Sequence, residues 1–380
     1  MEPTPGEPTP GDSWTAREIT QQPALWREVR AQLSLARLEI DAFLRPLLAR
    51  PNLRVVLTGA GTSAFAGAVL APALARQLRR RIDAVPTTDI VSNPLGNLAE
   101  DLPTLLVSFA RSGDSPESVA ATEVADQVLT ECFHLVVTCN DEGTLHLRHV
   151  ADPRSLVLLM PEGSNDRGFA MTSSFTCMLL AALIALGGDR DVEPLAVAAD
   201  QALTDVLQPA TALAGAGLRR VVHLGSGPLQ GLAQESALKL LELTAGRIVT
   251  YHDSALGFRH GPKAVLDDRT LAVVHVSNDP TTRRYDLDMV TELAGALPPG
   301  QVVAVTARPD GLDALPDGSV WLLDGLADVD DIALALPYVV CSQLLALRFS
   351  LALGLPTDNP FPSGEVNRVV KGVTIHPFTD

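Results

Sequence analysis

Three charged side chains on one apolar stretch have the spacing that acid–base chemistry requires. Glu235, Lys239 and Glu242 are four and three positions apart, so in a helix they share one face. Leucines fill most of the remaining face, which predicts that these charges are at least partly buried. A buried charge needs a partner, so we expect Lys239 to pair with one carboxylate and leave the other as a proton-transfer base. A purely structural Glu–Lys–Glu network has the same spacing and is the alternative.

His260 follows this helix in a segment rich in turn-forming residues. Gly257, Gly261 and Pro262 predict a defined turn with His260 at its tip. A histidine there can donate or accept a proton near neutral pH, although a loop histidine is more often only a surface residue. His252 and His260 lack metal-ligand spacing with acidic partners, so we predict no metal site.

Two further segments have the composition of phosphate-binding loops. In Gly59–Ser63, between a predicted strand and helix, glycines expose backbone amides and hydroxyls add donors at a helix N-terminus. Ala110–Ser118 follows another predicted strand, with Pro116 suited to a first helical turn. Each loop alone is also typical of an ordinary turn or cap. Together, at strand ends that face one crevice, they favour a phosphate site made by Gly61, Thr62, Ser63, Arg111, Ser112, Gly113, Ser115 and Ser118.

A repeat indicates that the fold is duplicated. Val55–Gly61 and Val221–Gly227 lie 166 positions apart, and each runs from a β-branched strand through Gly-x-Gly into a helical stretch. Strands alternate with helices in both halves, which predicts an α/β protein with two doubly wound parallel sheets, each flanked by helices in three αβα layers as in flavodoxin-like or Rossmann-like folds. The second copy has Pro228-Leu229 in place of Thr62-Ser63, so we expect it not to bind phosphate.

The predicted strands and helices indicate how the chain is divided into domains. Strands are predicted at 55–57, 105–109, 135–138, 156–159, 221–224, 271–276, 302–305 and 320–323. The apolar run Met178–Leu186 is too short for a membrane span and is predicted to be a buried helix. The expected parts are a flexible tail (1–14), a helical lead-in (15–45), a phosphate-binding domain (46–195), a catalytic domain (205–358) and a C-terminal segment (359–380).

Composition narrows the class of protein. The 380 residues are 46% hydrophobic, enough to bury two cores, and the net charge of −16 argues against a broad nucleic-acid surface. The four cysteines show no pairing pattern, which fits a reducing compartment, and the N-terminus has no signal-peptide character. We therefore expect a cytoplasmic protein with no nucleic-acid or membrane partner.

Taken together, these segments resemble the double-SIS sugar-phosphate isomerases, which have two tandem sugar-isomerase domains. The likeness runs from Thr15 to Phe378 and includes the isomerase half of glucosamine-6-phosphate synthase. The two loops are similar to that family's phosphate loops, 235–242 to its catalytic helix, 259–262 to its ring-opening loop and 367–374 to its C-terminal lysine segment. Residues 359–368 and 372–375 most resemble the branch named tagatose-6-phosphate ketose/aldose isomerase, some of whose members are similar to galactosamine-6-phosphate deaminases.

The resemblance implies an enzyme, a deaminating aldose–ketose isomerase of amino-sugar 6-phosphates. Galactosamine 6-phosphate would give tagatose 6-phosphate and ammonia, with no cofactor. The family implies a homodimer or tetramer whose active site lies at the subunit interface. The sequence does not distinguish galacto from gluco substrates.

The resemblance also assigns roles to residues. Thr62, Ser63, Ser112, Ser115 and Ser118 would hold the phosphate. Arg111 stands where the synthase has glutamine, and would supply a direct phosphate charge or close the pocket from outside. Of the catalytic residues, His260 would open the sugar ring, and Glu242 would move a proton between C2 and C1. Lys239 and Lys371 would stabilise charge on the substrate oxygen or form an imine. Glu235 would orient Lys239 or bind a sugar hydroxyl.

Four other functions fit all or part of the pattern. A non-deaminating isomerase or a fructosamine-phosphate deglycase needs the same residues. A non-catalytic sugar-phosphate sensor needs Thr62, Ser63 and Ser112 but not the catalytic set. Gly59–Ala64 with Asp83 also matches a dinucleotide fingerprint, but a dehydrogenase has little use for the second loop.

Overall fold

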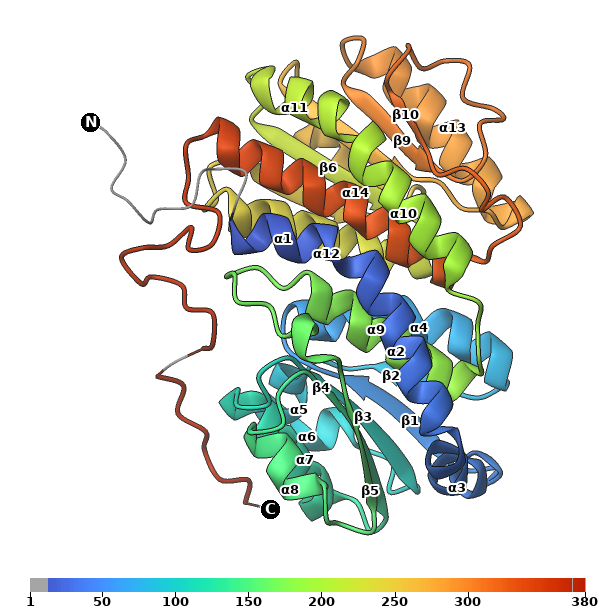
Figure 1. The fold of residues 1–380 in the computed structure, drawn as a ribbon, viewed down its shortest axis with the longest axis vertical. Helices are drawn as coiled ribbons and strands as arrows, with labels where there is room; N and C mark the ends of the chain where they lie inside the picture. The colour runs from blue at the N-terminus through green and yellow to red at the C-terminus, as the bar shows by residue number, and fades with distance from the viewer. Residues whose placement is uncertain (1–12, 371, 380) are drawn as a thin grey trace. The chain divides into compact units, whose positions relative to one another are not determined.

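The computed structural model describes residues 13–370 and 372–379 of the chain. Two five-stranded parallel sheets form the core, with strand orders β2-β1-β3-β4-β5 and β10-β9-β8-β6-β7 (Figure 1). Counted within its own half, each sheet has the order 2-1-3-4-5 of a doubly wound fold. The predicted fold of two tandem α/β sheets is therefore confirmed.

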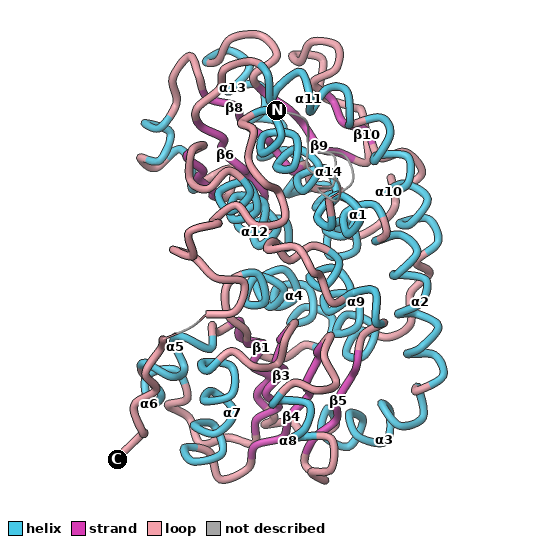
Figure 2. Tube along the Cα trace, turned by 60° about the vertical axis from the view of Figure 1, so that its left-hand side comes forward, coloured by secondary structure: helices cyan, strands magenta, loops and turns pink. Residues whose placement is uncertain are grey.

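The first sheet lies between two layers of helices. Its strands are β1 (Arg54–Thr58), β2 (Ile82–Ala84), β3 (Thr104–Ala110), β4 (Cys132–Thr138) and β5 (Ser155–Leu159). Helices α4 (Thr62–Leu78) and α9 (Ser173–Gly187) cover one face, and α5 (Thr87–Ser92), α6 (Pro94–Asn97), α7 (Pro116–Val128) and α8 (Thr144–His149) lie on the other (Figure 2). Every α9 residue from Ser173 to Leu186 is buried, which confirms the predicted buried helix.

The second sheet has the same arrangement. Its strands are β6 (Arg220–Gly225), β7 (Val249–Asp253), β8 (Thr270–His275), β9 (Val302–Thr306) and β10 (Val320–Leu322). Helices α12 (Pro228–Leu243) and α14 (Asp331–Ala352) cover one face, with α11 (Leu207–Gly215) packed on α14, and α13 (Pro280–Ala296) covers the other. Helix α14 is long and apolar enough to cross a membrane, but 94% of its most apolar window is buried in the protein, as in a core helix.

The chain folds into two compact units, and neither is continuous in sequence. The second-sheet unit contains 13–23, 166–172 and 194–365, and the first-sheet unit contains 24–165, 173–193 and 366–379. The lead-in consists of α1 (Trp14–Thr20), α2 (Gln22–Leu35) and α3 (Arg37–Leu48), and α10 (Glu193–Asp205) follows α9. The boundaries 46–195 and 205–358 remain a sequence-based division.

Helix α1 is joined to residues far along the chain within the second-sheet unit. The amides of Trp14 and Thr15 donate to the Asp358 carboxylate at 2.9 and 2.8 Å. The Gln22 side chain donates to Gln343 of α14 at 2.7 Å. The segment after α14 is therefore fixed, at Asp358, to the first turn of α1.

Strands β2 and β7 were not predicted. Each is an edge strand that pairs with one neighbour only and carries partly exposed residues, so it lacks the apolar run of a central strand. Tyr251, His252 and Asp253 lie in β7.

The duplicated turns have almost identical backbones. Gly61 has φ 56° and ψ −127°, and Gly227 has φ 59° and ψ −130°. A Cβ on Gly59 would lie 2.6 Å from the backbone of Ser63, and one on Gly225 would lie 2.3 Å from the Leu229 carbonyl. Gly59 and Gly225 are thus required by the same close approach of turn and helix, and Gly61 and Gly227 by their positive φ.

Candidate active site

The first phosphate loop joins β1 to α4. Thr62 and Ser63 are buried and occupy the first turn of α4. First-turn amides have no acceptor inside their own helix. The amide of Ser63 donates to the Ala60 carbonyl at 3.1 Å, while the amide of Thr62 lies at the helix start, beside exposed Gly61. A helix N-terminus of this form attracts an anion.

The second phosphate loop joins β3 to α7. Pro116 begins α7, as predicted, and Ser115 is the N-cap residue, whose side chain caps no amide of that helix. Ser112 accepts the amide of Asp114 at 3.3 Å, and Gly113 has φ 73°. Ser118 is buried in the first turn of α7. The predicted residues of each loop therefore lie between the carboxyl end of a strand and the start of a helix.

The segment after β4 supports the second loop and was missed by the sequence analysis. Asn140 donates to the Ser112 carbonyl at 2.8 Å, and the amide and hydroxyl of Thr144 both donate to Asp114 at 2.9 Å. A Cβ on Gly143 would lie 2.4 Å from the Ser112 carbonyl oxygen. These contacts span about 30 residues of sequence, so no local pattern could reveal them.

Three buried hydroxyls lie at this edge of the first sheet. Thr58 and Ser108 are partners across β1 and β3, and Thr87 begins α5, its amide donating to the Gly59 carbonyl at 2.8 Å. Within the described chain none of these three hydroxyls has a hydrogen-bond partner. Buried polar atoms of this kind are expected where a ligand or ordered water completes the bonding. They too were missed, because isolated Ser and Thr residues are common in strands.

The charged face of α12 lies in the second-sheet unit. Glu235 and Lys239 are fully buried, and the Glu242 side chain is 23% exposed. Lys239 Nζ lies 2.5 Å from Glu242 Oε2 and 3.6 Å from Glu235 Oε1. The predicted burial is confirmed. Lys239 pairs more closely with Glu242, so pairing alone would leave Glu235 as the base, but Glu235 is fully buried and Glu242 is the more accessible of the two carboxylates.

His260 lies directly after the 3-10 turn Gly257–Arg259, before a second one at Pro262–Val265, and is exposed. Gly261 has φ 116°. On either side of His260, Arg259 and Lys263 bind the same carboxylate, that of Glu292 on α13. The loop is thus fastened at both ends while its histidine faces outward. Among the described residues no hydrogen bond joins His260 to α12.

The second copy of the loop is occupied by the protein's own carboxylate. Asp286 is fully buried and accepts the Ser226 hydroxyl at 2.7 Å and the Ser277 amide at 3.0 Å. Burial raises the pKa of Asp286 to about 6. A buried carboxylate at this position repels a phosphate, which supports the expectation that only the first copy binds one.

The remaining predicted residues are Arg111 and Lys371. Arg111 is buried in the second phosphate loop and donates from Nη2 to the Arg368 carbonyl at 3.0 Å. Lys371 lies outside the described residues.

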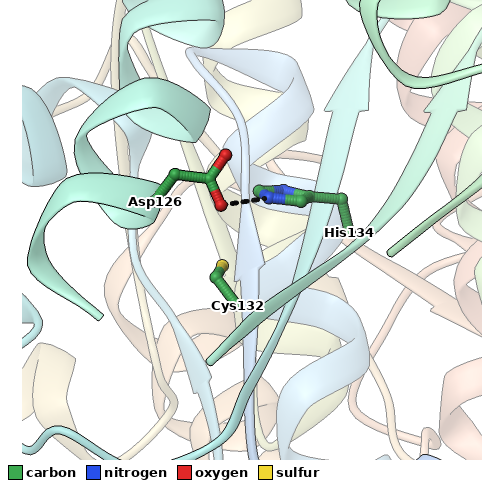
Figure 3. A group of neighbouring side chains, drawn as sticks. All are labelled: Asp126, Cys132 and His134. Carbon is green, nitrogen blue, oxygen red and sulfur yellow. Dashed lines mark hydrogen bonds and ion pairs between the residues drawn. The ribbon is translucent and has the colours of Figure 1, made fainter. Parts of the chain in front are cut away.

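A separate group, drawn in Figure 3, lies at the amino end of β4, whereas the phosphate loops follow the carboxyl ends of β1 and β3. His134 Nε2 is 3.2 Å from Asp126 Oδ1, beside Cys132. Arg154 also contacts the Asp126 carboxylate, at 3.5 Å. Burial raises the pKa of the Cys132 thiol to about 12, so this thiol stays protonated at neutral pH. The group therefore has its own partners, and we assign it no part in the site.

Comparison with known proteins supports this picture. Residues 47–186 match the SIS domain family. A protein of Streptomyces coelicolor, named putative D-galactosamine-6-phosphate deaminase AgaS, is 64% identical over 375 residues and 96% of each chain. An Escherichia coli protein named D-galactosamine-6-phosphate deaminase AgaS is 44% identical over 373 residues, again 96% of each chain. The crystal structure of the tagatose-6-phosphate ketose/aldose isomerase from E. coli superimposes with a TM-score of 0.90 at 42% identity, covering 99% of this chain and 100% of that one.

Proposed function

Because the chain belongs to the double-SIS family of sugar-phosphate isomerases, with its AgaS-named deaminases, we propose that it converts galactosamine 6-phosphate and water into tagatose 6-phosphate and ammonia. The observation that carries the proposal is the accessible Glu242 carboxylate beside buried Lys239 on α12. The names of the relatives support the choice of substrate.

The first-sheet loops provide the phosphate donors in this proposal. The hydroxyls of Thr62, Ser63, Ser112, Ser115 and Ser118 and the start of α4 hold the 6-phosphate. Fixing one end of a flexible sugar lowers the entropic cost of the reaction. The second sheet, with Asp286 in its own loop, takes no phosphate.

The chemistry belongs to α12 and the His260 loop. His260 takes the proton of the anomeric hydroxyl and returns a proton to the ring oxygen, which opens the ring. Glu242 then removes the proton from C2, while Lys239 or Lys371 stabilises the negative charge that develops on the C1 oxygen. Glu242 delivers its proton to C1, the C1 oxygen takes a proton from the lysine ammonium, and the nitrogen at C2 returns one to the lysine. The ketimine left at C2 is then hydrolysed by water to the ketone and ammonia. Glu235 orients Lys239, and neither metal nor cofactor takes part.

The proposal extends to two further features, the oligomeric state and the cellular location. His260 is exposed in its own subunit, which supports its acting on the substrate of a partner subunit in a homodimer or tetramer. All four cysteines are free and buried, which supports a cytoplasmic location.

The test is to incubate the enzyme separately with galactosamine 6-phosphate and glucosamine 6-phosphate, measuring ammonia and ketose phosphate together. We expect Glu242→Gln to lower ammonia release at least about 100-fold and to keep its affinity for inorganic phosphate. Glu193→Gln, which alters an exposed carboxylate paired with Arg27, is the matched control and should retain full activity.

Each other outcome contradicts the proposal in its own way. Ketose formation without ammonia, from non-amino aldose phosphates, would show a plain isomerase. Tight binding of sugar phosphates with neither product would show a sensor. Undiminished ammonia release by Glu242→Gln would remove this residue from the reaction.

A further inference from the structure

Arg111 lies within the second phosphate loop, yet its guanidinium reaches the C-terminal segment. The residue is 6% exposed, and Nη2 lies 3.0 Å from the carbonyl oxygen of Arg368. This carbonyl stands three positions before Lys371. The sequence suggested that Arg111 binds phosphate directly or closes the pocket, whereas this contact is with the backbone of the protein itself.

The C-terminal segment has a second attachment beyond Lys371. Phe378 packs against an apolar cluster of the first-sheet unit that includes Ile90 of α5 and Leu106 of β3. Figure 2 shows the end of the chain beside α5 and α6. The described residues on both sides of Lys371 are therefore fastened to the unit that carries the phosphate loops, by Arg111 before it and by Phe378 after it.

The Arg111 attachment is a hydrogen bond, and the Phe378 attachment is apolar packing. Most described residues from 362 to 379 are exposed, and the two contacts are made by side chains that are buried or partly buried. A hydrogen bond from a charged donor is stronger than one between neutral groups, and burial of Arg111 removes the competition of water. A guanidinium also has N–H donors pointing in several directions, so the Arg111 side chain can donate to the C-terminal segment while its backbone remains part of the second phosphate loop.

We propose that Arg111 is a positioning residue: it ties residues 366–370 to the second phosphate loop, so that the described part of the C-terminal segment is held against the loop that binds the sugar phosphate. The inference rests on the proposed function for the bound sugar phosphate and for the role of Lys371. The anchoring of the segment can be measured without turnover.

The experiment compares Arg111→Gln, Phe378→Ala, Lys371→Ala and the double variant Arg111→Gln/Lys371→Ala in the full-length enzyme. Three quantities are measured: kcat and KM for galactosamine 6-phosphate, the Kd for inorganic phosphate, and amide hydrogen exchange in peptides covering 366–379. We expect Arg111→Gln and Phe378→Ala to speed this exchange and to lower kcat on the order of 100-fold, since small misplacement of a reacting group has that effect. The Kd for inorganic phosphate stays at its wild-type value.

The double variant separates positioning from phosphate binding. If Arg111 acts through Lys371, the double variant has the activity of Lys371→Ala alone, because the two changes remove one and the same contribution. A phosphate ligand would give multiplicative losses, with a raised KM, a weaker Kd for phosphate and unchanged exchange. That result would overturn the proposal.

Failure of the proposed function gives a different pattern. If Lys371→Ala is fully active, or if the wild type releases no ammonia, the role of Lys371 falls while the exchange data still test the anchoring. Unchanged exchange in Arg111→Gln overturns the anchoring whatever the activity. Phe378→Ala alters no residue of the phosphate loops, so it tests the second attachment of the segment independently of Arg111.

Discussion

Replacing Lys239 by methionine tests whether the charged face of α12 is structural, catalytic or both. Methionine keeps most of the length of the side chain but removes the charge 3.6 Å from Glu235, which is fully buried, and 2.5 Å from Glu242. Removing one partner of a buried ion pair costs about 3–5 kcal/mol, since the remaining charge stays buried without it. For a unit of this size the melting temperature should fall by roughly 6–20 °C.

The double variant Glu235→Gln/Lys239→Met removes both buried charges. Since replacing a whole buried pair is often nearly neutral, we expect most of the lost stability to return. We expect ammonia release to stay abolished, because the lysine is still absent. Lys263→Met is the matched control: Lys263 also pairs with a carboxylate, but its side chain is 34% exposed, so the cost should be about 1 kcal/mol or less.

The assay is urea unfolding followed by intrinsic fluorescence, with ammonia release measured on the same samples. A Lys239→Met variant as stable as Lys263→Met would refute the burial argument. A double variant that regains activity along with stability would show that the Glu–Lys–Glu face is structural only.

Two further predictions concern pH and the duplicated turns. Glu18 is buried and accepts the amides of Arg167 and Gly168; burial first, and then Asp166, raises its pKa from 4.5 to about 7. The folded state thus holds a proton that the unfolded state loses between pH 4.5 and 7, so the free energy of unfolding should fall by about 3 kcal/mol across that window. Glu18→Gln should flatten this slope in urea unfolding at pH 5 and 8, and equal slopes would contradict it. Gly59→Ala should weaken the binding of inorganic phosphate in a titration, because its Cβ would lie 2.6 Å from Ser63. Gly225→Ala, at the matching turn, should lower stability and leave the affinity for phosphate unchanged. Equal effects of the two variants on this affinity would show that both loops bind phosphate.

Much of the fold was predictable because short sequence patterns, namely apolar runs and a repeated glycine motif, mark its central strands and turns. The central strands are continuous apolar runs, and the repeat at 166 positions predicted two turns whose glycines have φ 56° and 59°. The edge strands β2 and β7 were missed because partial exposure gives them no such run. The edge strands β5 and β10 are also partly exposed but were predicted, because their residues are mostly apolar.

The candidate site was predictable in its residue types but not in its contacts. The spacing of Glu235, Lys239 and Glu242 predicted one helix face, and the structure shows which carboxylate is nearer the lysine. The contact of Arg111 with Arg368 spans 257 positions, and no spacing rule operates over that distance. Sequence indicated that Arg111 departs from the family, and only the fold shows what it touches.

The attachment of α1 to Asp358 has a consequence for the order in which the protein is made. Thr15 and the carboxylate that binds its amide are 343 positions apart, so at about 5–20 residues per second the first helix leaves the ribosome roughly 17–70 s before its partner exists. The first-sheet unit likewise waits for residues 366–379. Each unit therefore lacks some of its native contacts until a segment more than 340 positions after Thr15 has been synthesised: the second-sheet unit waits for Asp358, and the first-sheet unit waits for the segment that follows residue 365.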